Sequence, residues 1–140
     1  MIKRWLLRTL TTGIATAVAT VFFLWLVMLS PFLYHPPGGP MPVDDNIEHR
    51  VFAYGTLTSS TVRWLVAGHR GDEEAAVLPQ YRREQLNIVP DPDTQTEGVV
   101  FTVTGEQLRR LDRYERVGIR YERVMMTLDD GRRAWVYRRL

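Results

Sequence analysis

The pattern of hydrophobic and polar positions divides the chain into an apolar first segment and a mixed remainder. Lys3, Arg4 and Arg8 precede a stretch without charge that continues to Asp44, and residues 10–29 within it are mostly apolar. A run of about 20 apolar residues matches the length that a helix needs to cross a membrane. Residues 1–33 are therefore predicted to be a membrane anchor with one transmembrane helix.

The flanks of this helix predict its orientation. Basic residues come before the apolar run, which by the positive-inside rule keeps the N-terminus in the cytoplasm and places the soluble part on the periplasmic or other extracytoplasmic side. A cleaved signal peptide is the alternative. We favour an uncleaved, single-pass signal anchor, because the small residues ATAVAT come before the most apolar part, whereas a cleavage site would follow it.

The polar remainder begins with a segment that has no apolar periodicity. Residues 34–46, YHPPGGPMPVDDN, are rich in proline and glycine, which is typical of an extended and partly stiff linker. The rest of the chain, residues 47–140, is long enough for one small domain. The alternation predicts strands at 49–54, 75–89 and 96–104, and a β-hairpin at 121–139. We expect a bulge at Pro79, a turn-rich loop at 90–95 and a two-residue turn at Asp130-Gly131.

Two short helices complete the pattern. Thr58 can cap the first, at 61–68, whose apolar positions are expected on one face: Val62, Leu65 and Val66. Thr104 and Gln107 form a capping box for the second, at 105–115. Five or six strands and two helices without regular βαβ spacing predict an α+β fold, with a mixed or largely antiparallel, barrel-like sheet.

Composition excludes several kinds of chemistry. The chain has no cysteine, so it forms no disulfide and has no thiolate nucleophile, and its three histidines show no metal-ligand spacing. The net charge is only +2, and we expect no nucleic-acid partner. The arginines of the last hairpin are expected to form a polar sheet edge. Nothing in the pattern indicates an oligomeric state.

One acidic residue falls on an apolar face. Leu108, Leu111 and Glu115 are spaced i, i+3 and i+7, so Glu115 shares the apolar stripe of the second helix. Partial burial and a place in the last helical turn should both raise its pKa, which suits proton exchange near neutral pH. The alternative is a carboxylate that turns outward and pairs with Arg116 or Arg120. Asp112 is expected to point away from Glu115 and to be an ordinary surface residue.

Five short motifs occur in a characteristic order: Tyr-Gly-Thr-Leu after the first strand, Gly-Val-Val-Phe-Thr-Val, Leu-Asp-Arg-Tyr-Glu, Tyr-Glu-Arg-Val and a closing Val-Tyr. This order over residues 51–139 resembles the γ-glutamylcyclotransferase-like superfamily, in particular its AIG2-like and γ-glutamylamine cyclotransferase branch. The resemblance implies a small, mostly antiparallel β-barrel flanked by short helices. It also implies that the enzyme uses no metal or organic cofactor.

The resemblance assigns roles to individual residues. The loop that gives backbone N–H groups to the substrate corresponds to Tyr54, Gly55, Thr56 and Leu57. The acid/base glutamate corresponds to Glu115, and the aromatic residue that helps to close the pocket corresponds to Tyr121. One departure is Arg116, because many members have glycine directly after the glutamate.

The expected reaction is the release of 5-oxoproline and a free amine or amino acid from a γ-glutamyl compound, the small-molecule substrate. Two alternatives remain open at this stage. The domain could be a membrane-tethered module of the same fold that binds such a ligand without turning it over. It could also be an anchored scaffold whose partner surface is the arginine-rich hairpin around Arg132 and Arg133.

Overall fold

The computed structural model describes residues 2–140, and its internal contacts divide the chain after Tyr34 into two units. The first unit contains helix α1 (Ile2–Met28) and the short 3-10 helix η1 (Pro31–Leu33). Helix α1 has 27 residues, so it is about 40 Å long. By length and composition it can cross a membrane, with mean hydropathy 2.0 in its most apolar window.

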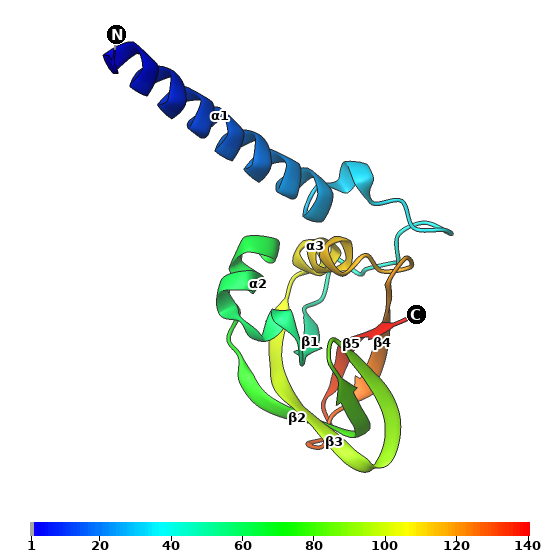
Figure 1. Ribbon diagram of the computed structural model, residues 1–140. Coiled ribbons are helices and arrows are strands. Elements are labelled where there is room, and N and C mark those ends of the chain that lie inside the picture. The colour runs from blue at the N-terminus through cyan, green and yellow to red at the C-terminus, as the bar shows by residue number, and fades with distance from the viewer. Residues whose placement is uncertain (1) are drawn as a thin grey trace. The chain divides into compact units, whose positions relative to one another are not determined.

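The second unit, His35–Leu140, is an α+β domain built on one curled five-stranded sheet (Figure 1). The strands are β1 (His49–Ala53), β2 (Glu74–Glu84), β3 (Asn87–Val103), β4 (Tyr121–Thr127) and β5 (Arg133–Arg139). Their order is β2-β3-β1-β5-β4, and every neighbouring pair is antiparallel except β1 with β5. Asp129 N donates to Val77 O at 3.0 Å, which links the β4–β5 connection to β2 at the other end of this order. The predicted fold class is confirmed.

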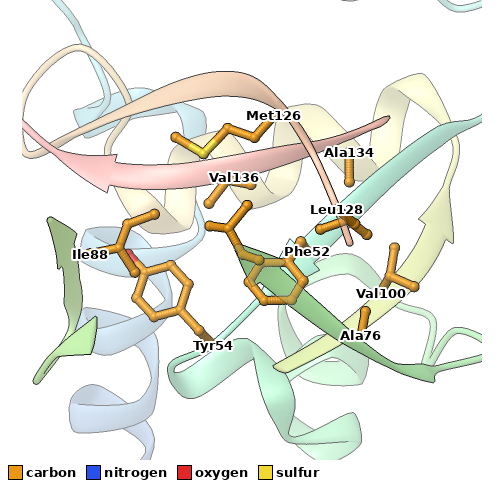
Figure 2. Packing of buried hydrophobic residues seen from close by; sticks show 10 residues of the cluster. Phe52, Tyr54, Ala76, Ile88, Val100, Met126, Leu128, Ala134 and Val136 are labelled. Atoms are coloured by element: carbon orange, nitrogen blue, oxygen red, sulfur yellow. The ribbon is translucent and has the colours of Figure 1, made fainter. Parts of the chain in front are cut away.

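The sheet curls around an apolar cluster. Figure 2 shows this cluster, to which every strand contributes; its largest fully buried members are Phe52, Leu78, Ile88 and Val136. Tyr54, directly after β1, belongs to the same cluster and is 5% exposed. The end of β1 is therefore fixed by the core, so the loop that follows it starts from a rigid point.

Two helices accompany the sheet. Helix α3 (Gly105–Glu115) begins with the predicted capping box: Thr104 N donates to Gln107 Oε1 at 2.9 Å, and Gln107 N donates to Thr104 Oγ1 at 3.3 Å. Leu108 and Leu111 on this helix are fully buried. Helix α2 (Ser60–Ala67) is capped by Ser59 rather than Thr58. Its buried positions are Arg63, Val66 and Ala67. Val62 is half-buried and Leu65 is 60% exposed, so the predicted apolar face is right at Val66 and wrong at Leu65.

Three further local predictions need correction. Residues 75–89 are not one strand: β2 ends at Glu84, and a turn at Gln85 and Leu86 leads into β3. The expected loop at 90–95 lies inside β3. Pairing with β2 holds on both sides of it, Pro79 with Gln95 and Tyr81 with Pro90, whereas residues 91–94 have no partner in β2. The hairpin turn is also longer than two residues, since Leu128 N bonds to Arg132 O at 2.8 Å. The predicted bulge is confirmed, with a register shift between Pro79 and Tyr81.

The segment predicted as a linker contacts the domain. Arg123 Nη2 donates to Pro42 O at 2.9 Å, and Arg109 Nη1 lies 2.7 Å from Asp45 Oδ1. His49 Nε2 lies 2.7 Å from Asp44 O. The stretch from Pro42 to Asp45 is thus fastened to β4, α3 and β1, while the boundaries predicted for anchor and linker stay predictions.

Candidate active site

The loop after β1 presents backbone donors. Gly55 precedes the 3-10 helix η2 (Thr56–Thr58), in which Thr58 N bonds to Gly55 O and Ser59 N bonds to Thr56 O. Within residues 2–140, the N–H groups of Gly55, Thr56 and Leu57 donate to no protein acceptor. Unpaired N–H groups in a turn are suited to bind an anion or a developing oxyanion.

A buried arginine holds this loop from behind. Arg63 on α2 is 1% exposed, and its Nη1 donates to Leu57 O at 2.7 Å and to Thr58 O at 3.0 Å. Its Nε donates to Arg70 O at 2.6 Å, and Glu73 forms an ion pair with it. Because the loop carbonyls are fixed in this way, the loop N–H groups are fixed too. This role of Arg63 could not be predicted from the sequence, because an arginine in a helix gives no local sign of burial.

Glu115 is turned inward at the end of α3. It is partly buried, and burial raises its pKa to about 7. In the described part of the chain its carboxylate has no hydrogen-bond or ion-pair partner, so the alternative of a pair with Arg116 or Arg120 is absent. A carboxyl group with this pKa is able to accept and return a proton near neutral pH.

The residues predicted from the sequence gather around the end of β1. Tyr54 is buried, and burial raises its pKa, with further contributions from the nearby charges of Tyr121 and Glu115. The hydroxyl of Tyr114, next to Glu115, donates to Thr56 Oγ1 at 3.3 Å, which joins the end of α3 to the loop. The loop, Glu115 and Tyr121 therefore share one region.

The tip of the β2–β3 hairpin borders this region. Tyr121 donates its hydroxyl hydrogen to Leu86 O at 3.1 Å. A Cβ on Gly55 would lie 3.4 Å from Leu86 Cδ2, so Leu86 packs beside the glycine of the loop. Leu86 was not among the predicted site residues, because its sequence neighbourhood predicts a strand and no turn at this position.

Asp112 was judged wrongly from the sequence. It is 3% exposed rather than on the surface, it accepts a hydrogen bond from Tyr137 at 2.8 Å, and its Oδ2 lies 3.0 Å from Arg123 Nη1. Asp112 and Glu115 are three residues apart on a helix and therefore share a face. Both raise the pKa of buried Tyr137, for which burial is the largest cause.

Arg116 occupies the helix C-cap in a left-handed conformation, with φ 54° and ψ 54°. Its N–H bonds to Arg113 O, and Val117 N bonds to Asp112 O, which closes the helix end. This conformation favours glycine, the residue that many members of the resembled superfamily have here. No group of three or more His, Asp or Glu side chains within residues 2–140 is arranged to hold a metal ion.

Comparisons with known proteins agree with this architecture. AIG2-like protein D from Arabidopsis thaliana is 30% identical over 90 residues, which cover 59% of this chain and 59% of that protein. The chain thus spans only about three-fifths of the length of this relative. A solution structure from Arabidopsis thaliana aligns with TM-score 0.58 and 27% identity, covering 66% of this chain and 69% of the other.

Two more distant structures share the fold. A gamma-glutamyl cyclotransferase aligns with TM-score 0.53 at 17% identity, over 67% of this chain and 68% of its own. A Homo sapiens protein aligns with TM-score 0.54 at 18% identity, over 69% of this chain and 68% of its own. The family model described as gamma-glutamyl cyclotransferase, AIG2-like, matches residues 51–139. With this match over most of its length, the chain belongs to the gamma-glutamyl cyclotransferase, AIG2-like family.

Proposed function

We propose that the domain is a cyclotransferase that releases 5-oxoproline and a free amine or amino acid from a γ-glutamyl compound. The observation that carries the proposal is the state of Glu115: partly buried, without a protein partner in residues 2–140, and with a pKa of about 7. A carboxylate that served only to stabilise the fold would be paired or exposed.

The reaction is intramolecular. The substrate's α-amine attacks its own γ-carbonyl carbon, a C–N bond forms, and the C–N bond to the leaving amine breaks. Because both reacting groups belong to one molecule, the site has mainly to hold one rotamer, and well-oriented reactions of this kind reach effective molarities of about 10⁵ M or more. Glu115 takes the proton from the α-ammonium and returns it to the leaving nitrogen.

The N–H groups of Gly55, Thr56 and Leu57 hold a substrate oxygen in this proposal, either on a carboxylate or on the carbonyl that becomes negative. Tyr121, linked to Leu86, limits the other side. Tyr54 forms the base of the site in this proposal. Its hydroxyl donates to Tyr137 O at 2.6 Å and so holds the ring in place.

The test compares the full-length protein in detergent with Glu115→Gln, which keeps the shape and removes the base. A panel of γ-glutamyl amines and γ-glutamyl dipeptides is assayed for 5-oxoproline. We expect the wild type to release it and the variant to lose about 10²-fold or more in kcat. Equal rates would remove Glu115 from the mechanism, and binding without any 5-oxoproline would identify a non-catalytic module instead.

We also propose that α1 anchors the domain as a single-pass segment, with the N-terminus in the cytoplasm and the domain on the periplasmic or other extracytoplasmic side. Lys3, Arg4 and Arg8 at its start support this orientation. A topology reporter fused after Leu140 tests it: activity only in the extracytoplasmic compartment is expected, and activity only in the cytoplasm reverses the orientation.

A further inference from the structure

The turn between α3 and β4 joins two residues of the candidate site. It runs from Arg116 to Arg120, directly after Glu115 and directly before Tyr121. Gly118 N donates to Tyr121 O at 2.7 Å, and Arg120 N donates to Arg116 O at 2.9 Å, so hydrogen bonds close the turn. The shape of this turn therefore sets the spacing between Glu115 and Tyr121.

Pro36, from the segment predicted as a linker, packs against this turn. A Cβ on Gly118 would lie 2.9 Å from Pro36 Cβ and 4.0 Å from Pro36 Cγ. Pro36 is buried, whereas its neighbours His35 and Pro37 are exposed. Gly118 also has φ 79°, so both the backbone and the proline ring favour glycine at this position. The ring of Pro36 thus lies directly on the turn, with no room for a methyl group between them.

The same segment makes a second contact close to the site. Arg123 Nη2 donates to Pro42 O at 2.9 Å, and Arg123 forms the buried ion pair with Asp112. Arg123 follows Tyr121 by two positions on β4, so the two side chains share a face of the strand. Residues 36–42 therefore contact both the turn after α3 and the buried pair that supports this helix.

We propose that residues 36–42 are a positioning segment of the active site, in which Pro36 acts through Gly118 to hold Glu115 and Tyr121 at the spacing that the reaction requires. The inference rests on the proposed function and extends it to a segment whose composition predicts only a spacer. Pro36 is a positioning residue, because it acts on the turn and not on the substrate. A misplacement of about 1 Å can cost about 10²-fold in rate, so a contact behind the turn can matter for catalysis.

A double-mutant cycle tests the contact. Gly118→Ala places a methyl group against Pro36 and also strains the backbone at its positive φ. Pro36→Gly removes the Cβ and the ring, so in this background only the backbone strain remains. The loss in urea midpoint caused by Gly118→Ala should therefore be smaller in Pro36→Gly than in the wild type. Equal losses in the two backgrounds would mean that the two residues are not coupled, and the proposal would fail.

A second measurement tests the effect on the reaction. Pro36→Gly is compared in the full-length protein with Pro40→Gly, which makes the same change at an exposed proline of the segment. At a temperature where both variants are fully folded, kcat for 5-oxoproline release should fall about tenfold in Pro36→Gly and stay at the wild-type value in Pro40→Gly. Wild-type kcat in Pro36→Gly would reduce Pro36 to a purely structural residue and overturn the inference.

A readout without turnover separates this inference from the proposed function. Absence of 5-oxoproline from the wild type counts against the reaction, but the placement of Glu115 can still be followed by unfolding at pH 5 and pH 7.5. The pH-dependent stability that Glu115 contributes, measured against Glu115→Gln in each background, should shrink in Pro36→Gly because a released turn lets water reach the carboxylate. It should persist in Pro40→Gly. An undiminished contribution in Pro36→Gly would show that Glu115 keeps its place without Pro36, which contradicts the proposal.

Discussion

Tyr137 donates its hydroxyl hydrogen to Asp112 Oδ1 across 2.8 Å, and both side chains are buried. This bond joins β5 to α3 one helical turn before Glu115. Tyr137 also holds the candidate site through its main chain, because its carbonyl oxygen accepts the hydroxyl hydrogen of Tyr54. Arg123 completes the arrangement: it pairs with Asp112 and stacks over Trp135, with 4.6 Å from its guanidinium carbon to the ring centroid.

Removing the Asp112 charge should destabilise the domain strongly. Asp112→Asn leaves the Arg123 guanidinium buried without its counter-charge, and breaking a buried pair in this way costs about 3–5 kcal/mol. Tyr137→Phe is the milder comparison, because it removes one neutral donor and should cost about 1 kcal/mol. Urea unfolding measures both free energies. A loss for Asp112→Asn no larger than that for Tyr137→Phe would show that the ion pair contributes little.

Local signals in the sequence predicted some parts of this site and missed others. The sequence shows two features directly, because each depends on residues of one helix. They are the capping box at Thr104 and the spacing that places Glu115 with Leu111. Asp112 cannot be identified in this way, because its partners come from strands that follow 11 and 25 residues later. The role of Arg63 is hidden for the same reason: its acceptors lie in two separate loops.

Composition failed where strand pairing competed with it. Residues 90–95, PDPDTQ, carry the residues of a turn, yet they continue β3 because β2 pairs on both sides of them. The actual turn, at Gln85 and Leu86, has neither glycine nor proline. Gln85 takes φ 55°, although glutamine is not a residue type that favours a positive φ. The hairpin tip beside the site was therefore invisible to turn rules based on residue type.

The raised pKa of Glu115 makes stability depend on pH. Burial raises this pKa from 4.5 to about 7, so the folded state binds a proton that the unfolded chain releases between these values. The contribution to stability is fully present below pH 4.5 and is lost as pH rises through 7. The full effect is at most about 3 kcal/mol. Relative to Glu115→Gln, the wild type should lose unfolding free energy between pH 5 and about 7.5.

This difference is measured by denaturant unfolding of both proteins at several pH values, so that contributions from Asp112 and the other carboxyl groups cancel. A pH-independent difference would mean that Glu115 titrates normally. In the activity assay, kcat/KM should rise with pH and level off above about 7, because only the deprotonated Glu115 can accept the proton.

Arg116→Gly should stabilise the helix end. Arg116 has φ 54°, a conformation that costs a residue with a Cβ about 1 kcal/mol and costs glycine nothing. Greater freedom of glycine in the unfolded chain offsets part of this gain, so a net increase of about 0.5 kcal/mol is expected. Arg120→Gly is the matched control, since Arg120 is exposed and lacks a positive φ, and it should be destabilising. If both changes lower the urea midpoint, the side chain of Arg116 contributes more than its backbone costs.

Arg63 should control the loop through geometry rather than charge. Its guanidinium serves Leu57 O, Thr58 O and Arg70 O at the same time, and it lies over the ring of Phe101, 4.8 Å from the centroid. A lysine keeps the charge but cannot donate in three directions from a planar fork. Arg63→Lys should therefore lower the unfolding free energy by about 2 kcal/mol.

The same variant separates the support of the loop from general stability. With the loop carbonyls released, the N–H groups of Gly55 to Leu57 lose their fixed direction, and kcat for 5-oxoproline release should fall about tenfold at temperatures where the variant is fully folded. Val66→Ala is the matched control on the same helix: it removes buried methyl groups at a comparable cost in stability and leaves the loop hydrogen bonds in place. Equal kcat in Arg63→Lys and Val66→Ala would show that Arg63 supports the fold alone, because a merely structural loss affects both variants alike.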